Sequence, residues 1–367
     1  MSEPTAPPSN SLPERPSLEQ LRRQARELKV AQSHPTLAGA QLALARSYGF
    51  PSWARLKRHV ELVTLRRLIT KGEPAPVRAL LDACPALARA RWSDGNTPLH
   101  LAAEENRAEI VALLVDRGAA LEGKLAESAH SPLSWAITCW SFDAAHRLVE
   151  LGSVPDLFCA AGLGLLDRVR SFWREDRLRP HPSRTGSSRY DDGGKRLPCP
   201  PPREEDQVSD ALYIACRADR PEVARWLLDH GADPNWRGYA GATCLAWAEF
   251  TGNAELCALL RERGGRDDLR DAQFEAVPRV FPLMVFAGWG FARKLAERLM
   301  ADRSLVSVRG GQGTLLHAAA SGGQVDATRV LLALGADRGA LDPAGHTPLE
   351  LAEAGGHRAV CELLRSA

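Results

Sequence analysis

One short motif returns along most of this 367-residue chain, and its spacing restricts the fold more than any other feature. Residues 94–103 read DGNTPLHLAA, residues 313–319 read GTLLHAA, and residues 345–352 read GHTPLELA. Thr347 lies 33 residues after Thr314, and Thr243 lies 33 residues after Asp210, which holds the same place in its copy. Repeats at such a period are typical of solenoids, in which each unit packs only on its neighbours. The sequence therefore predicts an elongated array with no single central core.

A second apolar stretch follows each copy of the motif. Residues 109–119 read EIVALLVDRGA, and residues 222–235 read EVARWLLDHGADPN. Glycine permits positive φ in a hairpin, threonine followed by proline opens a helix, and leucine and alanine pairs let short helices approach closely. Each unit is thus predicted to contain two short helices and a hairpin.

The combined motif resembles the ankyrin repeat, which implies an all-α solenoid of helix-turn-helix units joined by hairpins. We call the residue that takes the place of the motif threonine in each copy the marker residue. Nine markers place repeats over residues 63–367: Val63, Thr97, Ser131, Pro155, Asp210, Thr243, Phe281, Thr314 and Thr347. The seventh is ambiguous, because Val277-Pro278 and Phe281-Pro282 both fit the spacing.

The chain is predicted to contain five segments. Residues 1–16 are polar, rich in proline and expected to be disordered; residues 17–62 form a basic helical segment, with Ser17 and Ser52 as N-caps. Phe50 and Trp53 are expected to seal the first repeat. Residues 63–173 and 208–367 hold the two blocks of repeats, separated by a flexible insertion rich in Pro, Gly and Arg at residues 174–207. Residues 40–60 resemble an N-terminal helical segment of bacterial ankyrin-repeat proteins.

Composition narrows the class of protein. The formal net charge is only +2, so bulk polyanion binding is not indicated. The eight cysteines include no C-x-x-C pair and predict no zinc site. The start lacks the pattern of a secretory signal, and the longest uncharged apolar stretch, residues 280–292, is shorter than a membrane span. We expect a cytoplasmic protein without membrane contact.

Catalytic patterns are absent or incomplete. Gly162-Leu163-Gly164 lacks the third glycine of a dinucleotide site, and Gly193-Gly194-Lys195 lacks the first glycine of a P-loop. The resemblance implies that His100 and His317 form hydrogen bonds between repeats, with no role as bases or metal ligands. We therefore expect no enzyme, no cofactor and no metal, and we expect a protein partner bound on the concave face of hairpins and first helices.

Candidate contact residues come from positions that the repeat scaffold leaves variable. Aromatic side chains there are candidate hot spots, although they could equally pack on a neighbouring hairpin. Tyr239 and Phe250 lead the set, which continues with Thr251, Trp236, Trp92, Asn96, Glu104, Glu105, Trp289 and His346.

A nucleic-acid-binding regulator is the alternative function. Residues 18–60 carry eight basic and two acidic side chains, and residues 37–60 could form a helix-turn-helix-like segment. Arg55, Lys57 and Arg58 would then contact nucleic acid, or they are simply a solvated face. An enzyme assembled across repeats ranks third, since no nucleophile–base pair can be named.

Overall fold

The computed structural model describes residues 10–13, 16–31, 36–93, 95–125, 130–179, 189–190, 196–197, 204–238, 242–266, 281–310 and 312–366. The chain divides into two compact units, residues 1–155 and 156–367, and each is described by itself. None of the helices in these ranges combines the length and the apolar character needed to cross a bilayer.

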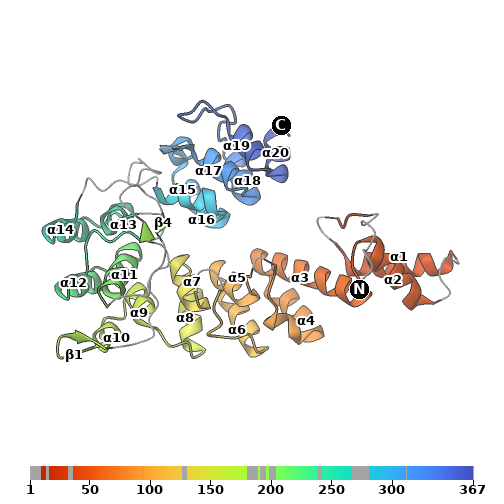
Figure 1. Cartoon of the computed structure of the whole chain (residues 1–367), viewed down its shortest axis with the longest axis horizontal. Coiled ribbons are helices and arrows are strands. Elements are labelled where there is room, and N and C mark those ends of the chain that lie inside the picture. The colour runs from red at the N-terminus through yellow and green to blue at the C-terminus, as the bar shows by residue number, and fades with distance from the viewer. Residues whose placement is uncertain are drawn as a thin grey trace. The chain divides into compact units, whose positions relative to one another are not determined.

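The first unit is helical throughout its described part (Figure 1). First helices α3, α5 and α7 pack in sequence on one another, and second helices α4, α6 and α8 do the same. The elements are α1 (Leu18–Val30), α2 (Leu37–Ser47), α3 (Trp53–Lys71), α4 (Pro74–Ala83), a 3₁₀ turn (Pro85–Arg89), α5 (Pro98–Glu104), α6 (Ala108–Asp116), α7 (Pro132–Thr138) and α8 (Phe142–Glu150).

Helices α1 and α2 and the first half of α3 enclose a small core of their own. The predicted N-caps are confirmed, because the Ser17 hydroxyl accepts from the Gln20 amide and the Ser52 hydroxyl from the Arg55 amide. Six residues form this core: Leu21, Ala25, Leu44, Ala45, Leu56 and Val60. Phe50 and Trp53 pack against this cluster, so they belong to the N-terminal segment and do not seal the first repeat as expected.

Residues 10–13 of the segment predicted to be disordered contact the N-terminal core. Leu12 packs on the same core, and the Asn10 amide donates to the Ser47 carbonyl over 3.0 Å. The polar composition of residues 1–16 hid this contact, because a single leucine supplies the apolar surface that anchors the segment.

The second unit repeats the arrangement (Figure 1). Helices α9, α11 and α13 pack in order, as do α15, α17 and α19. The helices are α9 (Leu157–Leu163), α10 (Leu166–Arg170), α11 (Glu204–Arg217), α12 (Pro221–Asp229), α13 (Cys244–Thr251), α14 (Ala254–Glu262), α15 (Phe281–Trp289), α16 (Ala292–Ala301), α17 (Leu315–Ser321), α18 (Val325–Ala333), α19 (Pro348–Ala354) and α20 (Arg358–Arg365), with a 3₁₀ turn at Arg303–Ser307.

Three antiparallel pairs of two-residue strands complete the second unit: β1 (Trp173–Arg174) with β2 (Arg177–Leu178), β3 (Arg189–Tyr190) with β4 (Arg196–Leu197), and β5 (Arg309–Gly310) with β6 (Gly313–Thr314). The predicted insertion, residues 174–207, therefore begins inside the β1–β2 hairpin. It ends inside α11, which starts at Glu204, four residues before the boundary expected at 208.

A left-handed residue marks the turn between the two helices of every repeat. Counting the marker residue as position 0, this residue is always at position 9. The nine are Gly72, Asn106, Trp140, Gly164, Asp219, Gly252, Gly290, Gly323 and Gly356. Gly290 lies nine residues after Phe281, where α15 also begins. The register that the sequence left open is therefore the Phe281-Pro282 one.

Buried histidines join neighbouring hairpins, as the resemblance implied. The Thr97 hydroxyl contacts His100 Nδ1 over 2.7 Å, and His100 Nε2 donates to the His130 carbonyl over 3.0 Å. In the eighth repeat, His317 makes the same pair of contacts with the Thr314 hydroxyl, over 2.8 Å, and the His346 carbonyl, over 3.0 Å. A neutral imidazole with its proton on Nε2 satisfies both contacts.

A second cross-repeat bond starts from position 10. Its side chain donates to the carbonyl at position 7 of the preceding repeat, which is one of the helix-end carbonyls without an intrahelical partner. The five pairs are Arg107 to Thr70 (2.6 Å), Ser141 to Glu104 (2.6 Å), Arg220 to Gly162 (3.2 Å), Gln324 to Gly288 (3.2 Å) and His357 to Ser321 (3.0 Å). In these five pairs the residue that precedes the second helix thereby caps the first helix of the preceding repeat.

Burial of His100 makes the stability of the first unit depend on pH. Burial lowers the pKa of His100 from 6.5 to about 4, so the unfolded chain takes up a proton that the folded chain refuses. The free energy of unfolding should fall as the pH drops from about 6.5 to 4, by on the order of 3 kcal/mol. In urea unfolding measured at pH 7.5 and at pH 5, the His100→Gln variant should lose less free energy of unfolding between the two pH values than the wild type. All other histidines are common to both proteins, so parallel pH profiles would contradict the assignment.

Candidate protein-binding surface

The expected contact residues lie at two places in each repeat: the hairpin before the marker residue and positions 7 and 8 at the end of the first helix. In α5, Glu104 is at position 7 and Glu105 at position 8. Glu104 Oε2 accepts from Trp135 Nε1 over 3.0 Å, and its carbonyl accepts the position-10 bond from Ser141. Glu104 therefore also ties the second repeat to the third.

The hairpin before Thr97 holds Trp92 and Asn96. Trp92 Nε1 donates to the Leu62 carbonyl over 3.4 Å, and the Arg66 guanidinium lies 5.0 Å from the centroid of its ring. Asn96 Oδ1 accepts from the Thr97 amide over 2.8 Å. Both side chains are half-buried, so they present an edge of the hairpin and hold its shape at the same time.

Three predicted residues lie in α13 or in the hairpin before it: Phe250 and Thr251 in the helix, and Trp236 in the hairpin. Phe250 meets Trp247 edge to face with ring centroids 6.0 Å apart, and the Arg298 guanidinium lies 5.2 Å from its ring centroid. Thr251 donates to the Ala248 carbonyl, and Trp236 Nε1 donates to Asp210 Oδ1 over 3.4 Å. Tyr239, the other leading candidate, lies outside the described residues.

Two predicted residues are exposed. Trp289 closes α15 at position 8, between Gly288 and Gly290, and is 40% exposed. His346 lies in the last hairpin, with its Nδ1 3.4 Å from Asp342 Oδ2. Trp289 is the most exposed of the aromatic side chains whose burial the structure describes.

The residues of the nucleic-acid alternative differ in what they contact. Lys57 pairs with Glu61 over 3.4 Å, and Arg58 donates to the Ala86 carbonyl over 3.0 Å. Arg55 is exposed in the first turn of α3. Arg58 thus holds α3 to the 3₁₀ turn that contains Ala86, whereas the pair of Lys57 with Glu61 lies within α3.

Two cations that the sequence did not single out, Arg66 and Arg298, stack on predicted aromatic residues. Trp92 and its partner are 26 positions apart, and Phe250 and its partner are 48 apart. Only the stacking of repeats brings such pairs together, so no local pattern could have found them.

The Tyr213 phenol and the Cys244 thiol, two groups capable of acid–base or nucleophilic chemistry, are deeply buried. Burial raises the pKa of the Tyr213 phenol and of the Cys244 thiol, so both stay protonated at neutral pH. In the described part of the chain, no group of three or more His, Cys, Asp or Glu side chains could hold a metal ion.

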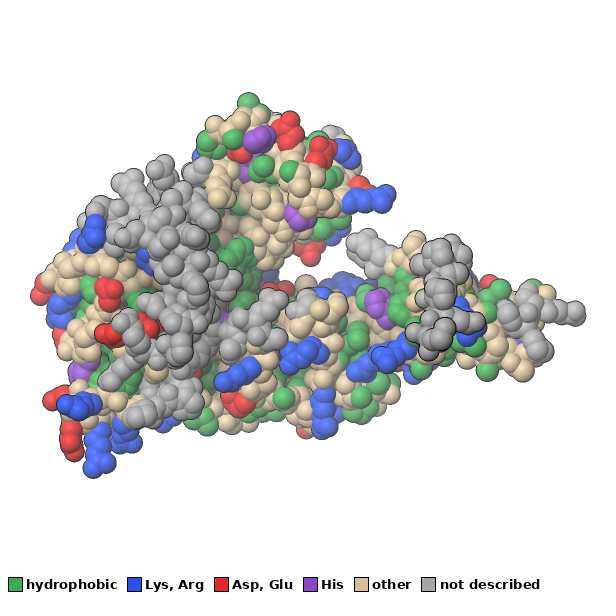
Figure 2. All heavy atoms as spheres, in the orientation of Figure 1, with side chains coloured by type: hydrophobic (Ala, Val, Ile, Leu, Met, Phe, Trp, Pro, Cys, Tyr) green, Lys and Arg blue, Asp and Glu red, His purple; other side chains and the backbone are tan. Residues whose placement is uncertain are grey.

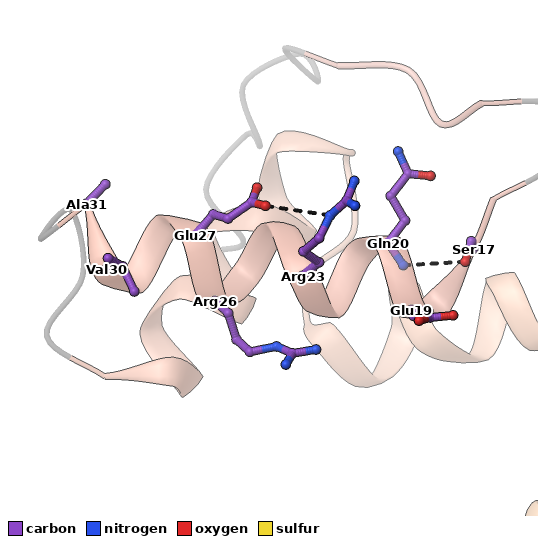
Figure 3. A pocket seen from close by; sticks show the side chains of 8 residues that line it. All are labelled: Ser17, Glu19, Gln20, Arg23, Arg26, Glu27, Val30 and Ala31. Atoms are coloured by element: carbon purple, nitrogen blue, oxygen red, sulfur yellow. Dashed lines mark hydrogen bonds and ion pairs between the residues drawn. The ribbon is translucent and has the colours of Figure 1, made fainter.

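A shallow hollow of about 790 Å³ runs along α1 and contains none of the predicted contact residues (Figure 3). Arg23 and Glu27 pair across 3.5 Å on its wall, and the Ser17 hydroxyl caps the start of the helix. All its lining residues come from α1 and the residues flanking it. The hollow is thus a feature of the N-terminal segment and not of the repeats.

Exposure separates Trp289 from its buried counterpart Trp247. Trp289→Ala should lower the free energy of unfolding by about 1 kcal/mol, because 40% of the residue is already in contact with solvent. Trp247 has no exposed surface. Trp247→Ala should therefore lower the free energy of unfolding by about 3–5 kcal/mol. Thermal and urea unfolding of the two variants measure the difference. Equal destabilisation would show that Trp289 is part of the core.

Comparisons with known proteins agree with the geometry. A family model described as "Ankyrin repeats (3 copies)" matches residues 64–158 and 283–367, and one described as "Ankyrin repeat" matches residues 210–239. The chain is 29% identical over 160 residues to the mouse (Mus musculus) "B-cell lymphoma 3 protein homolog". That match covers 42% of this chain and 34% of the mouse protein. With its nine position-9 turns and the matched models, the chain belongs to the ankyrin repeat family.

Proposed function

We propose that the chain is a non-catalytic adaptor or regulator that binds a protein partner through its hairpins and first-helix ends. The observation that carries the proposal is Trp289, a large aromatic side chain that remains 40% exposed at position 8. Tryptophan concentrates binding energy at protein interfaces, because its large rigid surface is buried at little cost in entropy.

The neighbours of Trp289 add support. Gly288 precedes it, and Ser321 and Gly322 hold positions 7 and 8 of the next repeat. Ser321 and Gly322 are exposed, and none of the three small residues carries a long side chain. A partner could therefore approach the indole from the side of α17 without displacing bulky groups.

Function through nucleic acid has less support. The proposed contact residues Lys57 and Arg58 are engaged with Glu61 and with the Ala86 carbonyl. Glu61 already neutralises Lys57, and Arg58 holds α3 to the neighbouring 3₁₀ turn, so both gain less from a phosphate than a cation that meets only water.

Affinity capture tests the proposal. The full chain should retain a specific protein from a nuclease-treated lysate of the source organism, and Trp289→Ala should reduce its recovery at least about tenfold. Met300→Ala is the matched control, because Met300 is 69% exposed on the second helix of the same repeat. Its recovery should equal that of the wild type.

Equal recovery with both variants would contradict the role of Trp289. Retention that disappears on nuclease treatment would instead favour the nucleic-acid alternative.

A further inference from the structure

Helix α3 carries most of the charge imbalance of the chain. Residues 1–93 contain 15 basic and 7 acidic side chains, a net +8, whereas residues 94–367 contain 32 and 38, a net −6. Within α3, Glu61 is the single acidic residue among six cations: Arg55, Lys57, Arg58, Arg66, Arg67 and Lys71. Lys and Arg side chains recur across α3 to α6 in the space-filling view (Figure 2).

Four residues of α3 form one outward stripe. Arg55, His59, Leu62 and Arg66 follow at intervals of 4, 3 and 4 residues, which places them on the same side of a helix. Arg55, His59 and Arg66 are exposed, and Leu62 is half-buried. At 1.5 Å per residue the stripe is about 16 Å long.

Two aromatic rings hold the stripe in place. The Phe50 ring lies 5.1 Å from the His59 ring, between centroids, and the Trp92 ring lies 5.0 Å from the Arg66 guanidinium. Trp92 is itself fixed by its hydrogen bond to the Leu62 carbonyl. The side chains of His59 and Arg66 are therefore restrained before a partner arrives, which reduces the entropy that binding must remove.

The stripe carries no carboxylate of its own. Glu61, with an 8% exposed side chain, pairs with Lys57 on another side of α3. The stripe thus presents two arginines and one histidine around a central apolar residue.

We propose that this stripe binds an acidic amphipathic helix of a protein partner. Its carboxylates would meet Arg55, His59 and Arg66, and one apolar side chain would meet Leu62. Two helices can match the 4-3-4 spacing over several turns, with apolar and charged anchors in register. The inference adds a second contact surface, with a partner class, to the proposed protein-binding function.

The contacts of the Phe50 and Trp92 rings favour a peptide over nucleic acid as the ligand of the stripe. Single strands bind largely by stacking bases on aromatic faces. Here the Phe50 ring already contacts His59 at a tilt, and the Trp92 ring already lies under the Arg66 guanidinium. The central position of the stripe, Leu62, also offers a phosphate no hydrogen bond.

The test uses a fluorescein-labelled peptide of sixteen residues with Glu at positions 1, 5 and 12, Leu at position 8, and Ala and Gln elsewhere. Fluorescence anisotropy with the full chain should show that it binds at least about tenfold more tightly than a scrambled peptide of equal composition. Arg55→Glu should weaken the matched peptide at least tenfold. Arg55 is exposed in the first turn of α3, where a glutamate suits the helix dipole, so the variant should fold.

Arg78→Glu is the matched control, since Arg78 is an exposed arginine on α4, outside the stripe; it should bind the peptide like the wild type. Equal affinity for matched and scrambled peptides would overturn the proposal, as would equal losses in the Arg55 and Arg78 variants. Tighter binding of a twenty-nucleotide oligothymidine, lost in Arg55→Glu, would assign the stripe to nucleic acid.

The two proposals fail separately. Trp289→Ala should leave peptide binding unchanged, because Trp289 is not part of the stripe. Failure of the peptide with intact Trp289-dependent capture would refute the stripe alone. Binding of the peptide without Trp289-dependent capture would refute only the role of Trp289.

Discussion

The end of each first helix presents carbonyl groups that the helix itself cannot satisfy, and in five pairs of described neighbours the next repeat supplies a donor to one of them. Position 10 does so from the next repeat, as Arg107 does for Thr70 and His357 for Ser321. A typical intramolecular hydrogen bond contributes about 0.5–1.5 kcal/mol to stability. Neighbouring repeats are thus coupled by a polar bond as well as by apolar packing.

At two position-9 glycines the side chain at position 10 of the next repeat also occupies the space of a Cβ. A Cβ at Gly72 would lie 2.7 Å from the Arg107 side chain, and one at Gly323 would lie 2.6 Å from His357. At these two positions glycine permits the positive φ and leaves room for the bonded side chain of the next repeat. Where position 10 of the next repeat is the short Ser141 or Asn253, position 9 is Asn106 or Asp219. Asn106 then uses its own side chain to cap the Ala144 amide of the next repeat over 2.9 Å.

Much of the fold could be predicted, because the repeat encodes each element locally. The helix starts followed from Thr and Ser markers, and the histidine bonds from the family resemblance. The register of the seventh repeat stayed open because two X-Pro pairs fit the spacing. What distinguishes them is the positive φ of Gly290, which is seen only in the backbone of the structure. The order of Leu12 and the packing of Phe50 depended on tertiary contacts of α1 and α2, which no repeat pattern describes.

The candidate surface was less predictable. Variable positions could be identified from the sequence. The sequence does not say which aromatic side chains at these positions pack within the fold. Trp92 and Phe250 stack on arginines distant in the sequence, whereas Trp289 remains exposed beside small neighbours. The stripe on α3 could likewise not be singled out within the basic segment. Recognising it requires knowing which cations form bonds within the protein.

Hydrogen exchange of the His357→Ala variant, measured by mass spectrometry, tests the central claim most directly. His357 belongs to the ninth repeat, but its imidazole donates to the eighth. If cross-repeat capping couples neighbours, amide protection should fall in α17 of the eighth repeat as well as in α19 and α20. A loss confined to α19 and α20, with α17 exchanging as in the wild type, would contradict the account.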